Sequence, residues 1–185
     1  FRVRATPNLE QPILKSNDEN PTGRPVVAQM IGNDIPSLVR TARELQQHPI
    51  VAVDLNLGCP APVVYKKCAG GGLLREPERV DAILGALRDA VQLKFTVKTR
   101  LGFDSPAVFE RLLPIFAKHS IDLLAVHVAD GHLALAAVLL RGVHLLDAAV
   151  AWRHGHPLWE AEARVLDGAT RAARDLRAGL RAGDG

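Results

Sequence analysis

The chain has 185 residues, of which 48% are hydrophobic and 23% charged, a composition typical of a soluble globular protein with one buried core. No apolar run is long enough to span a bilayer, so we expect no membrane partner. The net charge of +3 permits an RNA partner without requiring one. The two cysteines, Cys59 and Cys68, indicate no disulfide framework, so we expect a reducing compartment, the cytoplasm.

The first 24 residues are polar and rich in Asn, Pro and Glu, which is typical of a loop, with one helical turn expected at residues 9–14. The sequence begins with neither an initiator methionine nor the apolar core of a signal peptide. We therefore expect it to start inside a longer protein.

Strands and helices are expected to alternate after residue 24. Apolar runs predict strands at 25–31, 51–58, 95–101 and 123–128, and helices are expected from Asp34 to about residue 47, at 76–91 and at 105–119. Pro114 is expected to kink the last helix, and residues 59–75 are expected to form a long glycine-rich loop. This order predicts parallel βαβ units, in either an open doubly wound sheet or a (β/α)8 barrel.

Residue alternation assigns the two faces of the strands. Thr96, Lys98 and Arg100 share one face of their strand, and Asp54 and Asn56 share one face of theirs. The opposite faces are mostly aliphatic and suited to packing against helices. Polar groups near the carboxyl end of a strand are typical of a barrel whose active site lies at that end.

The most specific short motif is Asn56-Leu57-Gly58-Cys59-Pro60, where a strand ends and a loop begins. A cysteine there can act as an acid, a nucleophile or a metal ligand, or it can be an inert buried thiol. Cys59 and Cys68 are poor metal ligands as a pair, because no second Cys/His pair lies at ligand spacing. We expect no metal site here or at His154 and His156.

Lys98 and Arg100 place two cations on one interior face. A buried cation is costly unless an anion meets it, so we expect either an ion pair with Asp54 or another barrel carboxylate, or contact with a phosphate, a flavin or RNA. The three glycines at 70–72 follow two lysines, and a solvated loop is favoured there over a phosphate site.

The composition changes sharply after His127. Residues 128–185 contain no Lys, Asn, Gln, Ile, Phe, Ser, Tyr, Cys or Met. The tail is either an Ala/Leu/Arg-rich helical segment, especially at 160–180, or the product of a shifted reading frame in GC-rich DNA. We therefore divide the chain into a partial barrel domain, 1–127, and a tail, 128–185.

Several segments together resemble the tRNA-dihydrouridine synthases, over about residues 1–127. The matching segments are Val26-Val27-Ala28-Gln29-Met30-Ile31-Gly32, Asp54-Leu55-Asn56-Leu57-Gly58-Cys59-Pro60-Ala61-Pro62, Lys67, Gly70-Gly71-Gly72-Leu73-Leu74, Val97-Lys98-Thr99-Arg100-Leu101-Gly102 and Val126-His127. As a set they are highly specific for that family. The resemblance implies a partial (β/α)8 TIM barrel of the FMN-binding type.

The resemblance also implies an activity, in which FMN reduced by NADPH reduces the C5–C6 bond of uridine in tRNA. Cys59 would then be the catalytic acid that protonates C5. Gln29, Lys98 and His127 match flavin-contacting positions, with Lys98 near the N1–O2 edge of the ring. Asn56 and Arg100 match positions close to the target base, which must be flipped out of its stack to reach the site.

The chain departs from the family pattern in three places. The first barrel strand is missing, His127 is followed by Val128-Ala129-Asp130 where the family has Gly-Arg-Thr, and the later phosphate-binding strands and the helical RNA-binding domain are not recognisable. Two alternatives therefore stand beside an active enzyme. One is an inactive remnant of the family, and the other is an FMN barrel of the dihydroorotate dehydrogenase type.

Overall fold

One sheet organises the described part of the chain. The computed structural model describes residue 3 and residues 14–15, 17–105, 107–129 and 132–138. Five strands, β1 (Val27–Met30), β2 (Ala52–Leu57), β3 (Lys94–Arg100), β4 (Leu123–Ala129) and β5 (His132–Val138), follow one another across the sheet in sequence order. Between them lie α2 (Ile35–Leu45), α3 (Pro62–Tyr65), the 3-10 helix η1 (Gly70–Arg75), α4 (Pro77–Ala90) and α5 (Val108–Lys118).

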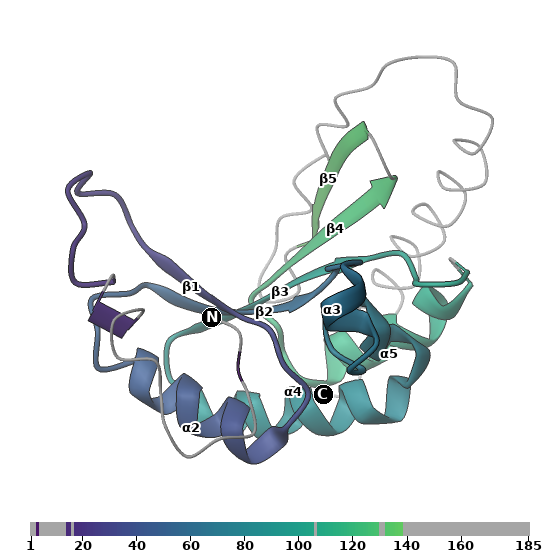
Figure 1. Ribbon diagram of the computed structural model, residues 1–185, viewed down its shortest axis with the longest axis horizontal. Helices are drawn as coiled ribbons and strands as arrows, with labels where there is room; N and C mark the ends of the chain where they lie inside the picture. The colour runs from purple at the N-terminus through teal and green to yellow at the C-terminus, as the bar shows by residue number, and fades with distance from the viewer. Residues whose placement is uncertain (1–2, 4–13, 16, 106, 130–131, 139–185) are drawn as a thin grey trace, which may run out of the picture.

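The connections between the strands show that the sheet is wound in one direction. β1 to β4 pair in parallel with their sequence neighbours, and α2, α4 and α5 lie together beneath the sheet (Figure 1). A doubly wound sheet reverses its strand order and carries helices on both faces, whereas a barrel places every helix outside its strands. The predicted fold class, α/β and part of a (β/α)8 barrel, is therefore confirmed.

Local signals set the helix boundaries. The Asp34 carboxylate accepts a hydrogen bond from the Ser37 backbone N–H at 3.0 Å and caps α2, and Pro36 occupies the first turn, where the missing N–H is not needed. Hydrogen bonds from Ser37 lower the pKa of Asp34. Pro77 opens α4 in the same way, and Pro114 lies inside α5.

The helical side of the sheet forms the core. Met30, Val53, Leu55, Val97 and Leu124 alternate along four strands with exposures of 0%. They belong to the same core cluster as α4 side chains such as Val80, Ile83, Leu84 and Leu87. Burying a side chain of this size stabilises the fold by about 1.5–3 kcal/mol. Because successive strand residues point to opposite faces of the sheet, burial of these side chains against the helices places their neighbours on the opposite face.

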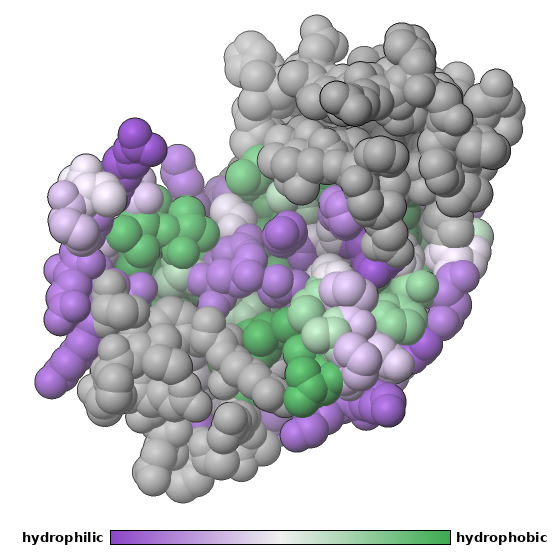
Figure 2. Space-filling model, turned by 45° about the horizontal axis from the view of Figure 1, so that its top comes forward, coloured by the Kyte–Doolittle hydropathy of each residue, from purple (hydrophilic) through white to green (hydrophobic). Residues whose placement is uncertain are grey.

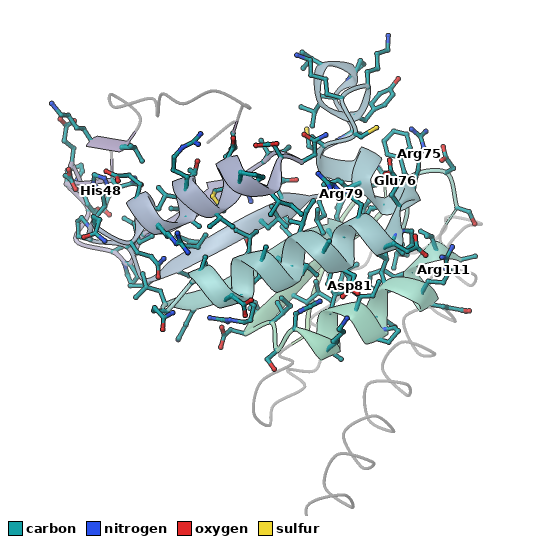
Figure 3. All side chains as sticks on the ribbon, turned by 90° about the horizontal axis from the view of Figure 1, so that it is seen from below. His48, Arg75, Glu76, Arg79, Asp81 and Arg111 are labelled. Carbon is teal, nitrogen blue, oxygen red and sulfur yellow. The ribbon has the colours of Figure 1, made fainter. Side chains whose placement is uncertain are left out.

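Ion pairs join the helices on the outside of this core. Asp81 of α4 accepts hydrogen bonds from Lys118 at 2.8 Å and from the His119 ring, and Arg111 of α5 donates to Glu78 at 2.8 Å. The bonds from Lys118 and then His119 lower the pKa of Asp81. Figure 3, which shows the helical side, labels Asp81 and Arg111 on the two neighbouring helices. The α4–α5 pair is thus tied at two points, Glu78 and Asp81.

The last strand breaks the parallel pattern. β5 pairs antiparallel with β4, and the register shifts between His127 and Ala129.

The structure describes the tail only at residues 128–129 and 132–138. The helical segment proposed for residues 160–180, and most of the turn proposed for 9–14, lie outside the described residues. None of the described helices has both the length and the apolar character needed to cross a membrane.

Candidate active site at the carboxyl ends of the strands

The polar site residues lie on the sheet face that turns away from the helices. The strand register pairs Gln29 with Asp54, Asn56 with Lys98 and Arg100 with His127. Side chains of paired residues point to the same face, and all five residues named in the site prediction beside Cys59 are on it. Figure 2, with this face turned forward, shows hydrophilic side chains gathered in its centre.

Hydrogen bonds connect β1 to β2 on this face. Gln29 Nε2 donates to Asp54 Oδ2 at 2.7 Å, and Asn56 Nδ2 donates to Gln29 Oε1 at 2.9 Å. Asp54 Oδ1 accepts from Thr96 Oγ1 of β3 at 2.6 Å. Three neighbouring strands thus contribute to one polar network.

Asn56 carries this network to the cysteine. Its Oδ1 accepts hydrogen bonds from the backbone N–H groups of Gly58 and Cys59, both at 3.0 Å. The side chain of Asn56 therefore shapes the turn that leaves β2 and carries Cys59, two residues beyond the end of the strand. Cys59 is a half-buried free thiol, so a small molecule can reach it.

The segment after Cys59 is compact, and the expectation of a solvated glycine-rich loop was wrong. Gly70, Gly71 and Gly72 are buried in η1. A Cβ on Gly71 would lie 3.1 Å from Cys59 O, and one on Gly72 would lie 2.7 Å from Tyr65 O. Gly71 and Gly72 are thus required because backbone packs on backbone at these two positions. Gly70 also has a φ of +54°, which glycine adopts without strain.

An arginine clamps this segment to the loop after β3. The Arg75 guanidinium lies 4.1 Å from the centre of the Phe103 ring and donates to both Asp104 oxygens at 2.6 and 2.8 Å. The hydrogen bonds from Arg75 lower the pKa of Asp104. Phe103 also contacts Tyr65, with ring centres 4.9 Å apart. These contacts, near Arg75 in Figure 3, tie the Cys59 segment to a second loop at the same end of the sheet.

The structure corrects one interpretation of the cations. Lys98 forms no ion pair with Asp54, whose two oxygens accept from Gln29 and Thr96 instead. Lys98 is exposed, and its ammonium group has no ion-pair partner among the described residues. Arg100 and His127 are half-buried neighbours across β3 and β4.

Metal ligands do not gather anywhere in the described ranges: no three His, Cys, Asp or Glu side chains there could hold a metal ion. His154 and His156 lie outside those ranges.

Sequence reasoning assigned no role to Asp54 in holding Gln29, nor any role to Thr96 or Phe103. The position of Asp54, two residues before Asn56 and on the same face, was a visible signal that both act together. The contacts with Thr96 and Phe103 depend on strand register and loop packing, which local patterns do not contain.

Comparison with known proteins gives one consistent family. The family model described as dihydrouridine synthase matches residues 4–128. The tRNA-dihydrouridine(16) synthase of Vibrio cholerae is 32% identical over 118 residues, which are 63% of this chain and 36% of that protein. The enzyme of the same name from Pseudomonas putida is 39% identical over 97 residues, 51% of this chain and 30% of the relative.

A second group of relatives carries a different name. The tRNA-dihydrouridine synthase B of Vibrio vulnificus is 39% identical over 77 residues, 42% of this chain and 24% of that protein. The chain thus spans 24–36% of the length of these curated relatives.

Proposed function

The chain belongs to the dihydrouridine synthase family, and on that premise we propose that it forms part of an enzyme that reduces uridine in tRNA to dihydrouridine. The observation that carries the proposal is the hydrogen-bonded set of Gln29, Asn56 and the Cys59 backbone at the carboxyl ends of β1 and β2. Active sites of parallel barrels are built at this end.

The described residues fit one edge of a flavin. An isoalloxazine ring offers alternating hydrogen-bond acceptors and a donor along its pyrimidine edge. The amide of Gln29, the ammonium group of Lys98 and the imidazole of His127 present matching donors and acceptors on one face of three strands. The positive charge of Lys98 suits the N1–O2 edge, where a reduced flavin is negative. These residues would hold FMN, which when bound supplies hydride, with NADPH as the source of electrons.

Cys59 supplies the proton in this proposal. Its Sγ–H donates to C5 of the uracil as the hydride reaches C6, and the thiolate that remains takes up a proton from solvent. The turn held by Asn56 keeps the thiol above the strand end, where the substrate ring would lie. The partly exposed position of Cys59 lets the ring approach it.

Asn56 and Arg100 would recognise the base. An amide and a guanidinium can pair with the carbonyl and imide groups of uracil, and the base must leave its stack to enter the site. The substrate is tRNA, which fits the net charge of +3 and the cytoplasmic location expected from the sequence.

The test is a dihydrouridine assay on tRNA with FMN and NADPH, comparing the chain with Cys59→Ala and Cys68→Ala. Loss of a positioned general acid slows a reaction by about 10²–10⁴-fold, so Cys59→Ala should lose activity by that factor while Cys68→Ala keeps it. Equal activity of the two variants would refute the role of Cys59. An inactive wild-type chain would refute the proposal for this polypeptide.

A further inference from the structure

Asp54 is a buried carboxylate that the proposed chemistry does not use. It is 7% exposed, and burying a carboxylate is costly unless its oxygens accept hydrogen bonds. Both oxygens do so, one from Thr96 Oγ1 at 2.6 Å and the other from Gln29 Nε2 at 2.7 Å. Through Gln29, Asp54 is linked by hydrogen bonds to Asn56 and to the backbone of Cys59.

The direction of the hydrogen bonds from Asp54 to Cys59 is fixed at both ends. A carboxylate can only accept, and the backbone N–H groups of Gly58 and Cys59 can only donate. The amides of Gln29 and Asn56 stand between these two ends, each with one donor side and one acceptor side. The observed order satisfies each hydrogen bond between Asp54 and Cys59, since Gln29 donates to Asp54, Asn56 donates to Gln29, and the turn donates to Asn56.

Reversing either amide would break the order. A reversed Gln29 would place its oxygen against the Asp54 carboxylate and its Nε2 against Asn56 Nδ2. If Asn56 reversed as well, its Nδ2 would face the N–H groups of Gly58 and Cys59. Each arrangement opposes two acceptors or two donors, and an unmade bond of this kind costs about 1–3 kcal/mol.

We infer that Asp54 is a positioning residue, whose carboxylate orients the amides of Gln29 and Asn56 and thereby holds the turn that carries Cys59. The inference rests on the proposed function for the roles of Gln29, Asn56 and Cys59, and adds a residue to which that function assigns no contact with cofactor or substrate. Thr96 donates to the second carboxylate oxygen, the one that Gln29 does not use.

The consequence for the site is a defined donor and acceptor pattern. Gln29 keeps its Nε2 toward Asp54 and its Oε1 toward Asn56, so any ring placed on this face meets one fixed edge of the amide. Asn56 uses Oδ1 to accept hydrogen bonds from the turn. Its Nδ2 therefore points to the neighbouring strand, where it donates to Gln29 Oε1. Preorganised groups of this kind need no rearrangement when a ligand binds.

The experiment measures Cys59 without needing catalysis. In a Cys68→Ser background, the rate of Cys59 alkylation by iodoacetamide is measured in native buffer for four further substitutions. Asp54→Leu removes the acceptor at similar size. Asp54→Asn can still turn an oxygen to Gln29, because its NH2 group can donate to Thr96 Oγ1. Thr96→Val keeps the carboxylate, and Gln29→Leu removes the link at an exposed position.

Asp54→Leu and Gln29→Leu should each speed Cys59 alkylation about tenfold, the factor expected when a net contribution of one hydrogen bond to the turn is lost. Asp54→Asn and Thr96→Val should each keep the rate of Cys59 alkylation within twofold of wild type. Nuclear magnetic resonance should show the Asn56 side-chain amide signals shifted in Asp54→Leu, although the two side chains share no hydrogen bond.

Unchanged alkylation and unchanged Asn56 signals in folded Asp54→Leu would overturn the inference. If that variant does not fold, an unchanged rate in Gln29→Leu overturns it equally. Neither readout needs flavin or tRNA, so an inactive or colourless chain would count against the proposed function and leave this test decisive.

Discussion

Replacing Gly72 by alanine should loosen the segment that supports Cys59. The added Cβ would lie 2.7 Å from Tyr65 O, 3.0 Å from Tyr65 Cα and 3.2 Å from Tyr65 C. All three atoms belong to the backbone at the end of α3, which cannot rotate aside as a side chain would. Either α3 or η1 must therefore move.

The cost follows from two opposing terms. Overpacking of this kind destabilises a protein by about 1–3 kcal/mol, and the lower entropy of alanine in the unfolded chain returns about 0.4–1 kcal/mol. The net loss is on the order of 1–2 kcal/mol, which lowers the Tm by roughly 2–8 °C in a chain of this length.

Gly58→Ala is the matched control. Its Cβ would meet Thr99 C at 3.4 Å, an ordinary contact, and Gly58 is not among the glycines with positive φ. Its stability should stay equal or rise by up to about 1 kcal/mol. Urea unfolding followed by circular dichroism measures both variants against wild type. Equal midpoints for Gly72→Ala and Gly58→Ala would refute the close packing of η1 on α3.

Two further predictions concern the core and the helical face. Phe95→Ala should destabilise the chain by about 3–5 kcal/mol, because Phe95 is fully buried. Val27→Ala, at a position with 51% exposure, should change stability by under about 0.5 kcal/mol. Similar urea midpoints for the two variants would contradict the assigned core. The lowered pKa of Asp81 means that the folded state binds its proton less readily than the unfolded state. Its contribution to stability is therefore present above about pH 4 and is lost as the pH falls through the lowered pKa. The urea midpoint of wild type should thus fall more steeply below about pH 4 than that of Asp81→Asn, and parallel pH profiles would show that the Lys118 and His119 bonds contribute nothing.

Local sequence patterns were sufficient to predict the first four strands and three of the helices. The helix expected from Asp34 agrees with the structure, in which Asp34 caps α2 and Pro36 lies in its first turn. Alternation along 95–101 placed Lys98 and Arg100 opposite Phe95 and Val97, and the burial of the two apolar residues confirms that division. These features depend on neighbours within a few residues, so the sequence contains them.

The parts that sequence reasoning missed depend on distant partners. The glycines 70–72 looked like a flexible loop, because nothing nearby in the sequence shows that Tyr65 O and Phe103 approach their backbone. An ion pair of Lys98 with Asp54 was one of the alternatives left open on charge alone, whereas the register brings Gln29 and Thr96 to Asp54 from positions 25 and 42 residues away. The antiparallel β5 follows a change in composition that carried no strand signal.

Retention of flavin tests the central proposal most directly. The purified chain is mixed with FMN, desalted, and examined for the visible flavin band, alongside Lys98→Ala and Lys94→Ala. Lys94 lies on the same strand and face as Lys98 but at the amino end, away from the site. The proposal predicts a retained band for wild type and Lys94→Ala, and a weaker or absent one for Lys98→Ala. A colourless wild-type protein, or equal retention by both lysine variants, would contradict it.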